Sequence, residues 1–352
     1  MNALELKKSL DAILTLSKNY SRFIPSLEYV RFDRLPMGCV VTWSHPELHI
    51  ESRLETCETF DAQPFMVNIK QLKTVLNKSE SVVFESQGPD IYATIDGNRI
   101  RLDSIEPVDS LYNDKSSFRY SYLSGLNEGF KVSYAASCDA SRFNLSVVRV
   151  ENNESGLSFV ATDGHRISIV ETWQQIESPL NIDARLAQNV LKLKKFDLSK
   201  CRVEISKNSF RVGDKTLTVT SRLIDGDYPD WKRMLKTYEQ SGESVRVVKK
   251  ADLANAIKKA LPLLDKRQPA LRVIMNGLVA LTNSTESFSF NVGCTVGRGD
   301  ADFFVNAKYL LDAIESFETK EITLAIEPRD NKPLFVGLGR CDNTTMIMIM
   351  RK

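Results

Sequence analysis

The densest group of side chains that could do chemistry lies at residues 161–166, which read Ala-Thr-Asp-Gly-His-Arg. Its carboxylate and imidazole, Asp163 and His165, are residue types that serve as general acids and bases. Neither has a Ser or Cys in a nucleophile motif to activate, and no third metal ligand is evident nearby. A Thr-Asp-Gly turn between two β-rich runs explains the same residues. We therefore interpret the segment as a turn, with a DNA-processing enzyme that uses Asp163 and His165 as the weaker alternative.

Other catalytic and cofactor classes find little support. The six cysteines are scattered without a CxxC pair, and the three histidines lie near none of them in metal-ligand spacing. The chain contains neither GxxxxGK[ST] nor GxGxxG, the glycine-rich loops that cradle phosphates. We expect no metal, no nucleotide and no other cofactor.

Two further strings stand out. Residues 223–231, Leu-Ile-Asp-Gly-Asp-Tyr-Pro-Asp-Trp, combine an Asp-Gly turn with a proline-fixed aromatic segment, which fits either loop packing or the lip of an apolar groove. After Thr345, residues 346–350 at the carboxyl end alternate methionine and isoleucine, and the segment stays apolar until Arg351. So apolar a tail is expected to be a strand held in a sheet, and its methionines suit an adaptable binding surface.

The elements that would position these residues repeat three times. Residues 67–76, 182–191 and 305–314 each show a β-branched residue, then Asn or Asp, a basic residue two further on and an apolar pair. This pattern predicts a strand, an Asn or Asp N-cap and an amphipathic helix. The period of about 115–123 residues favours tandem domains over a solenoid. An earlier helix is expected in each repeat, at 5–18, 129–141 and 251–266.

Short β-rich runs outnumber the helices and are joined by short turns such as Asp96-Gly97. This favours an α+β class with antiparallel sheets and two helices per domain. We place the three domains at 1–118, 119–244 and 245–352.

Charge is segregated along the chain. Forty-seven Lys and Arg against 45 Asp and Glu give a net charge of only +2, but the basic residues gather on the expected helices. Lysine on one helix is ordinary, whereas basic faces in three repeats favour a polyanion surface. A charged amino terminus and the lack of a long apolar run predict a cytoplasmic protein without a membrane segment.

Taken together, the motifs resemble the bacterial DNA polymerase III beta subunit, the sliding clamp family. The resemblance rests on four stretches in order: 161–166, 223–231, Asn306-x-x-Tyr-Leu-Leu-Asp312, and Met348-x-Met350-Arg351. It implies three similar domains per chain and a head-to-tail homodimer, a six-domain ring with helices lining the hole. The implied function is to encircle duplex DNA and to confer processivity on the replicative polymerase, without catalytic activity.

The family also implies a cleft between the second and third domains that binds short peptides of partner proteins. Carried over to matching positions, the cleft comprises Leu145, Thr162, Gly164, His165, Arg166, Ile167, Pro229, Arg233, Met234, Asn306, Tyr309, Pro333, Met348, Met350 and Arg351. Ile349 and Lys352 depart from the family pattern at the cleft.

The resemblance further implies a ring interface in which Ile100 and Leu102 meet Leu263 and Leu264, next to Pro262, which is expected to end its helix early. Implied partners are double-stranded DNA without sequence readout, a second copy of the chain, the DNA polymerase III catalytic subunit, an ATP-driven clamp loader, and other polymerases and repair factors. A clamp-fold protein that binds partners without encircling DNA remains an alternative. The candidate DNA-facing residues are Arg22, Lys70, Lys73, Arg142, Arg185, Lys192, Lys250, Lys258 and Lys308.

Overall fold

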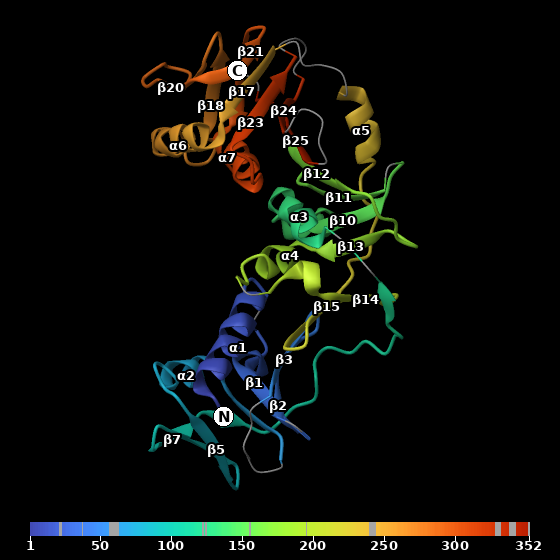
Figure 1. Ribbon diagram of the computed structural model, residues 1–352, viewed down its shortest axis with the longest axis vertical. Helices are drawn as coiled ribbons and strands as arrows, with labels where there is room; N and C mark the ends of the chain where they lie inside the picture. Colours follow the sequence, from blue (N-terminus) through green and yellow to red (C-terminus); the bar gives the residue numbers. More distant parts are fainter. Residues whose placement is uncertain are drawn as a thin grey trace. The chain divides into compact units, whose positions relative to one another are not determined.

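The computed structural model (Figure 1) describes residues 1–20, 23–36, 38–55, 63–121, 123, 125–154, 156–194, 196–238, 244–327, 332–337 and 343–350. The chain divides into two compact units. Unit 1 comprises Met1–Leu126 and Arg185–Leu223, and unit 2 comprises Asn127–Ala184 and Ile224–Lys352. Among the described residues, no helix is both long and apolar enough to cross a membrane.

Unit 1 is built on a nine-stranded antiparallel sheet. Its order is β8 (Ser104–Ile105), β4 (Phe65–Asn68), β1 (Tyr29–Leu35), β2 (Gly38–His45), β3 (Leu48–Leu54), β16 (Leu217–Arg222), β15 (Ser209–Gly213), β14 (Arg202–Ile205) and β9 (Arg119–Ser121). A second sheet of three strands comprises β5 (Val82–Gln87), β6 (Asp90–Ile95) and β7 (Asn98–Leu102). The helical elements are α1 (Ala3–Leu16), α2 (Ile69–Val75), most of α4 (Ala184–Val190), and the 3₁₀ turns η1 (Pro25–Glu28) and η4 (Leu198–Lys200).

Unit 2 has the same kind of architecture. Its nine-stranded sheet has the order β13 (Leu180–Asp183), β10 (Val147–Asn152), β11 (Leu157–Thr162), β12 (Arg166–Thr172), β25 (Asn343–Ile347), β24 (Leu334–Gly337), β23 (Glu321–Ile326), β17 (Ser244–Lys249) and β21 (Cys294–Arg298). A four-stranded sheet has the order β20 (Phe290–Val292), β19 (Val279–Thr282), β18 (Ala270–Met275) and β22 (Ala301–Asn306). The helical elements are α3 (Leu126–Phe130), α5 (Trp231–Tyr238), α6 (Lys250–Ala260), α7 (Ala307–Ser316), and the 3₁₀ turns η2 (Lys131–Ala135), η3 (Ala140–Leu145) and η5 (Leu261–Leu263).

The repeated strand and helix pattern is confirmed in all three repeats, and the expected asparagine caps are confirmed in two of them. β4, β13 and β22 lead directly into α2, α4 and α7. Asn68 Oδ1 accepts from the amides of Lys70 and Gln71 at 3.0 and 3.1 Å. Asn306 Oδ1 accepts from the amides of Lys308 and Tyr309 at 3.0 and 3.3 Å. Each asparagine thereby satisfies two of the amides that a helix start leaves free.

The prediction of a helix at 129–141 was wrong over most of its length. The α-helix ends at Phe130 and gives way to 3₁₀ turns. Gly129 lies flat against the ring of Phe159, where an added Cβ would stand 2.4 Å from a ring carbon. Val132 and Ser133 are also weak helix formers, so tertiary packing decides this segment.

Two strand pairs tie sequence-distant segments into the large sheets. In unit 1, β16 pairs with β3 from Leu217 opposite Ser52 to Ser221 opposite Leu48; we call this the first junction. In unit 2, β12 pairs with β25 from Arg166 opposite Ile347 to Val170 opposite Asn343; we call this the second junction. The expected α+β class with antiparallel sheets is confirmed, and so is the expectation that the carboxyl-terminal segment forms a strand within a sheet. The three domains at 1–118, 119–244 and 245–352 remain a proposal.

Candidate functional site

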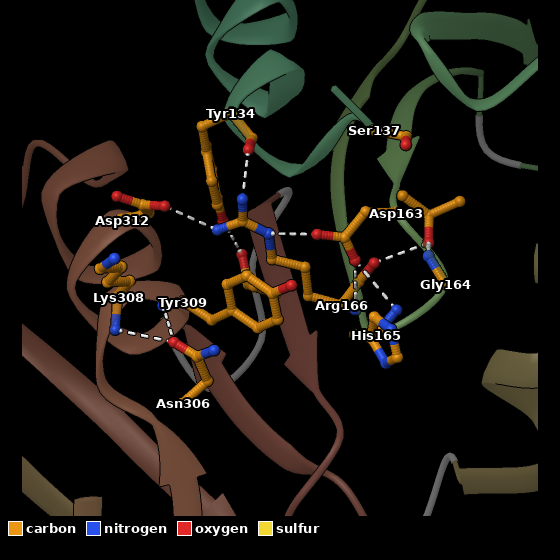
Figure 2. A network of polar contacts seen from close by, with 12 residues as sticks. Tyr134, Ser137, Asp163, Gly164, His165, Arg166, Asn306, Lys308, Tyr309 and Asp312 are labelled. Carbon is orange, nitrogen blue, oxygen red and sulfur yellow. Dashed lines mark hydrogen bonds and ion pairs between the residues drawn. The ribbon is translucent and has the colours of Figure 1, made fainter. Parts of the chain in front are cut away.

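A network of polar contacts in unit 2 is centred on Arg166, the first residue of β12 (Figure 2). Its Nε donates to Asp163 Oδ2 at 3.1 Å, and its Nη1 donates to Asp312 Oδ2 at 2.8 Å. Its Nη2 donates to the carbonyl oxygen of Tyr134 at 2.7 Å. The side chain is only 8% exposed, so its charge is matched by two carboxylates within the protein.

Two tyrosine rings flank this guanidinium. Its central carbon lies 4.3 Å from the ring centroid of Tyr309 on α7 and 5.2 Å from that of Tyr134 in η2. The hydroxyl of Tyr134 also hydrogen-bonds to Thr345 Oγ1 on β25 at 2.7 Å. Burial, with nearby Asp163 as a second cause, raises the pKa of Tyr309, and burial raises that of Tyr134. Both phenols stay neutral at physiological pH and serve in packing and hydrogen bonding.

The interpretation of 161–166 as a turn is confirmed. Asp163 Oδ1 accepts from the amides of His165 and Arg166 at 2.9 and 3.1 Å. Thr162 Oγ1 accepts from the amide of Gly164 at 3.1 Å and donates to the carbonyl oxygen of Arg166 at 2.6 Å. Gly164 has φ 88°, which favours glycine. The carboxylate of Asp163 is thus engaged in shaping the turn and holding Arg166, while the His165 side chain faces outward.

The carboxyl-terminal segment passes directly beside this turn. The amide of Met348 donates to the carbonyl oxygen of His165 at 2.9 Å, and the amide of Met350 donates to that of Phe304 at 2.7 Å. Met348 and Met350 are half-buried, and Met346 is buried. The structure therefore places the predicted residue His165 next to the segment that carries the predicted residues Met348 and Met350. Arg351 and Lys352 lie outside the described residues.

The string 223–231 packs through Trp231 against the strands β10, β11 and β12. Trp231 is buried and its Nε1 donates to Glu151 Oε1 at 3.0 Å, which fixes the start of α5 on β10. Trp231 forms a small apolar cluster with Val160, Ile167, Ile169 and Met346, against which Tyr228, Met234, Leu235 and Phe335 pack. We call this the Trp231 cluster. It unites the predicted residues Ile167 and Met234 with the methionine-rich end of the chain.

The string 223–231 ends at Trp231, which is the first residue of α5 (Trp231–Tyr238). The side chain of Asp230 accepts from the amide of Arg233 at 3.1 Å and so caps this helix. The other predicted residues lie near the elements just described but in different settings. Pro229 and Arg233 are exposed at the start of α5, Leu145 is half-buried at the end of η3, and Pro333 is buried just before β24.

The candidate DNA-facing residues in the described chain all lie on helical elements or directly after one. Several already have anionic or carbonyl partners. Lys73 pairs with Asp11 at 2.6 Å, Arg185 with Glu47 at 2.9 Å and Lys258 with Glu315 at 2.7 Å. Exposed pairs of this kind are worth about 0–1 kcal/mol, so phosphate can replace the carboxylate at small cost. The remaining placed residues are Lys70, Arg142, Lys192, Lys250 and Lys308, and Arg22 lies outside the described residues.

The residues of the expected ring interface occupy two local settings. Ile100 and Leu102 lie on β7, an edge strand of the three-stranded sheet. Leu263 is 54% exposed at the end of η5, and Leu264 follows it. The expectation that Pro262 ends its helix early is confirmed, because α6 stops at Ala260 and Pro262 lies in the 3₁₀ turn.

Sequence reasoning missed Tyr134 and Asp312, the two residues that complete the Arg166 network. Asp312 stands three residues after Tyr309 and therefore lies on the same face of α7. A buried arginine needs acidic partners, so this spacing was an available signal. Tyr134 lies in the irregular segment predicted as a helix, where periodicity gave no guide.

Comparison with known proteins gives a consistent result. The family model for the DNA polymerase III beta subunit, central domain, matches residues 130–230. The beta sliding clamp of Synechocystis sp. is 25% identical over 256 residues, 64% of this chain and 63% of that protein. The beta sliding clamp of Pseudomonas aeruginosa is 23% identical over 229 residues, 63% of this chain and 62% of that protein. Each match spans less than two thirds of the relative's length.

The fold is shared along the whole chain. The crystal structure of the DNA polymerase sliding clamp from Bacillus subtilis superposes with a TM-score of 0.83 at 17% identity, covering 100% of this chain and 98% of that one. The sliding clamp of Bartonella birtlesii bound to griselimycin gives a TM-score of 0.85 at 17% identity, with the same coverage. The predicted fold is confirmed.

Proposed function

We propose that this chain, a divergent relative of the bacterial DNA polymerase III beta subunit, is a DNA sliding clamp that tethers a polymerase to duplex DNA. The observation that carries the proposal is the fold, which matches solved beta clamps over 100% of the chain although identity is only 15–20%. The family match of the central segment supports it. In this role the protein supplies no catalytic group and acts as an accessory subunit of the polymerase.

The active form in this proposal is a head-to-tail homodimer that encircles DNA, with basic helices facing the duplex. Lys70 and Lys308 are exposed beside the N-caps of α2 and α7, one in each unit. Lysines that contact phosphates bind every sequence equally and exchange readily, which permits sliding. A clamp raises the effective concentration of its bound polymerase at the template without a new contact.

A test of encirclement uses linear duplex DNA biotinylated at both ends. The protein is threaded on first, streptavidin then caps the ends, and retention is measured in 0.5 M salt before and after a restriction cut. We expect retention on capped DNA and release after the cut. Leu263→Asp, at the proposed ring interface, should abolish retention, whereas Trp173→Asp, which changes another exposed apolar residue, should not. Sedimentation should show a dimer of 39.8 kDa chains.

Equal release from capped and cut DNA, together with a strictly monomeric chain, would contradict the ring. It would favour the alternative of a clamp-fold protein that binds partners without encircling DNA. In this proposal, ring formation depends most on the region around Pro262 and the exposed Leu263.

We further propose that peptides of partner proteins bind where the turn at 161–166, the Trp231 cluster and the segment 346–350 meet. Half-buried Met234, Met348 and Tyr309 offer apolar side chains there, and the exposed residue His165 is joined to Met348 by a backbone hydrogen bond. Such side chains make pockets for apolar anchors. Because each nitrogen of Arg166 already donates to an internal partner, its part in this site is to hold the turn against α7.

The probe for this site is griselimycin, with which the Bartonella birtlesii clamp was crystallised. We expect fluorescently labelled griselimycin to bind saturably, and His165→Ala and Met348→Ala each to weaken binding at least fivefold. His165→Ala keeps the backbone bond to Met348, so the fold should be unaffected. Trp173→Ala, an exposed residue 79% accessible to solvent, is the matched control and should leave binding unchanged. Equal affinity for all four proteins would contradict the site.

The structure weighs against a DNA-processing enzyme based on Asp163 and His165. Both oxygens of Asp163 accept hydrogen bonds from the turn and from Arg166, which leaves this carboxylate fixed as a structural anion. The same His165→Ala variant distinguishes the two ideas, because an enzyme would lose turnover of DNA rather than affinity for the peptide-site ligand.

A further inference from the structure

A cavity of about 600 Å³ lies in unit 1, formed entirely by residues of that unit. Its walls come from α1, from the end of β3, from the segment after α4 and from the turn between β15 and β16. The apolar part of the lining consists of Ala12, Leu54, Leu193, Phe196 and Leu217. This volume falls within the range of roughly 300–1,000 Å³ typical of small-molecule sites.

The cavity lining also includes hydroxyl groups. The hydroxyls of Ser9 on α1 and Ser52 on β3 line it, are buried, and hydrogen-bond to each other. Thr15, six residues after Ser9 on α1, also lines the cavity, and its hydroxyl donates to the carbonyl oxygen of Asp11 at 2.7 Å. A ligand that enters can therefore exchange hydrogen bonds with hydroxyl groups while its body contacts apolar side chains.

The charged residues that line the cavity leave a local excess of positive charge. Four cations line the cavity: Lys8, Arg53, Lys192 and Lys194. Of its four acids, Asp11 is paired with Lys73 at 2.6 Å. Asp214 Oδ1 accepts from the amides of Thr216 and Leu217 at 2.7 and 2.8 Å, so it is held by its own turn. Because amide donors stabilise the Asp214 carboxylate in its charged form, Glu5, Glu55 and Asp214 remain beside the four cations.

The environment of Lys192 illustrates why this excess of positive charge favours a bound anion. Its Nζ is held by Asn189 Oδ1 at 3.0 Å. Partial burial and the neighbouring charge of Lys18 both lower the pKa of this lysine. An ammonium that is partly desolvated beside another cation gains from a nearby anion.

We propose that this cavity binds a small organic anion with a compact apolar body, its charge at Lys8, Lys192 and Lys194 and its body against Phe196 and Leu217. A duplex phosphate backbone would use the lysines alone and has no need of the apolar floor formed by Leu54 and Leu193. The combination of a basic rim with an apolar interior therefore favours an amphipathic small molecule over DNA. This site is separate from the residues proposed to bind partner peptides, which lie in unit 2.

The test uses 8-anilinonaphthalene-1-sulfonate, a fluorescent aryl sulfonate, titrated into the full-length protein. We expect saturable binding of one molecule per chain. Ala12→Leu fills the cavity and should weaken binding at least tenfold, and Lys8→Gln and Lys192→Gln should each weaken it several-fold. Lys7→Gln is the matched control, because Lys7 is the adjacent residue of α1, bonds to Asn77 and does not line the cavity. It should leave the affinity unchanged.

Thermal unfolding checks that each variant folds. Lys192→Gln, in the segment after α4, keeps the test valid if Ala12→Leu does not fold. Dye binding that is equal in the wild type, Lys8→Gln and Lys192→Gln would overturn the proposal, as would equal losses in Lys8→Gln and Lys7→Gln. A further contrary outcome is that Lys8→Gln and Lys192→Gln weaken binding of a 30-base-pair duplex but not of the dye. The cavity rim would then be part of a phosphate-binding surface.

Discussion

The first and second junctions use the same three kinds of side chain in different ways. At the second junction Arg166 comes from the strand β12 and reaches the helix α7, where it meets Asp312 and Tyr309. At the first junction the arginine comes from a helix instead. Arg185 on α4 reaches Glu47 in the turn between β2 and β3 at 2.9 Å, and its guanidinium carbon lies 4.3 Å from the ring centroid of Tyr20.

Burial separates the two contacts. The Arg166 side chain is 8% exposed, whereas those of Arg185 and Glu47 are 36% and 50% exposed. Removing one member of a buried ion pair leaves a charge without compensation, but an exposed pair exchanges its partner for water. The same chemical motif is therefore structural at the second junction and nearly neutral at the first. An exchangeable arginine suits a proposed DNA contact, and a fixed one suits the support of a peptide site.

The largest expected effect follows from Arg166→Ala. It strands Asp163, Asp312 and the Tyr134 carbonyl, and should lower the free energy of unfolding by about 3 kcal/mol. Hydrogen exchange measured by mass spectrometry should show faster exchange in the peptides that cover α7 and the turn at 161–166. Arg166→Lys keeps the charge but loses the planar fork, and should recover only part of the loss. Stability equal to the wild type would remove the distinction between the junctions.

Asp312→Ala should have a smaller effect, because Asp312 is 44% exposed and its loss frees one nitrogen of Arg166 close to solvent. We expect a decrease of about 1 kcal/mol in the free energy of unfolding in urea. A double-mutant cycle with Arg166→Ala isolates the interaction between the two side chains. A coupling energy near zero would mean that Asp163 alone compensates Arg166.

The stability of unit 1 should depend on pH through Asp114, which lies in the segment 106–118 between β8 and β9. Burial opposes ionisation of Asp114, but hydrogen bonds from Ser116, Ser209 and Ser206 outweigh it and lower its pKa to about 2. A depressed pKa stabilises the fold above the unfolded value of 3.8, and this stabilisation is lost as pH falls from about 4 to 2. Urea unfolding across this window should show the loss, and Asp114→Asn should flatten it. An unchanged acid profile in Asp114→Asn would contradict this role.

The smallest expected effect is that of Arg185→Ala at the first junction. The exposed pair with Glu47 and the stacking on Tyr20 together should contribute about 0.5–1 kcal/mol to the free energy of unfolding. The same variant should nevertheless weaken retention on end-capped DNA at moderate salt, if Arg185 faces the duplex as proposed. A destabilisation as large as that of Arg166→Ala would show that burial does not distinguish the junctions.

The repeated strand, cap and helix units could be predicted from the sequence, because the N-cap asparagines and the apolar spacing are local signals. Asn68 and Asn306 cap α2 and α7 where the pattern placed them. The turn at 161–166 could be predicted as well, since Thr162, Asp163 and Gly164 encode that turn with their own side chains and backbone.

Two partners of Arg166 could not be predicted from the sequence. Tyr134 and Asp312 are 32 and 146 residues away and are brought together with Arg166 by strand pairing and helix packing, whereas Asp163 is a local partner in the same turn. The helix predicted at 129–141 also ends early in the folded chain. The α-helix stops at Phe130, where Gly129 packs closely against the ring of Phe159. Periodicity reports which face of an element is apolar, but burial and long-range charge pairing depend on what the fold lays against that face.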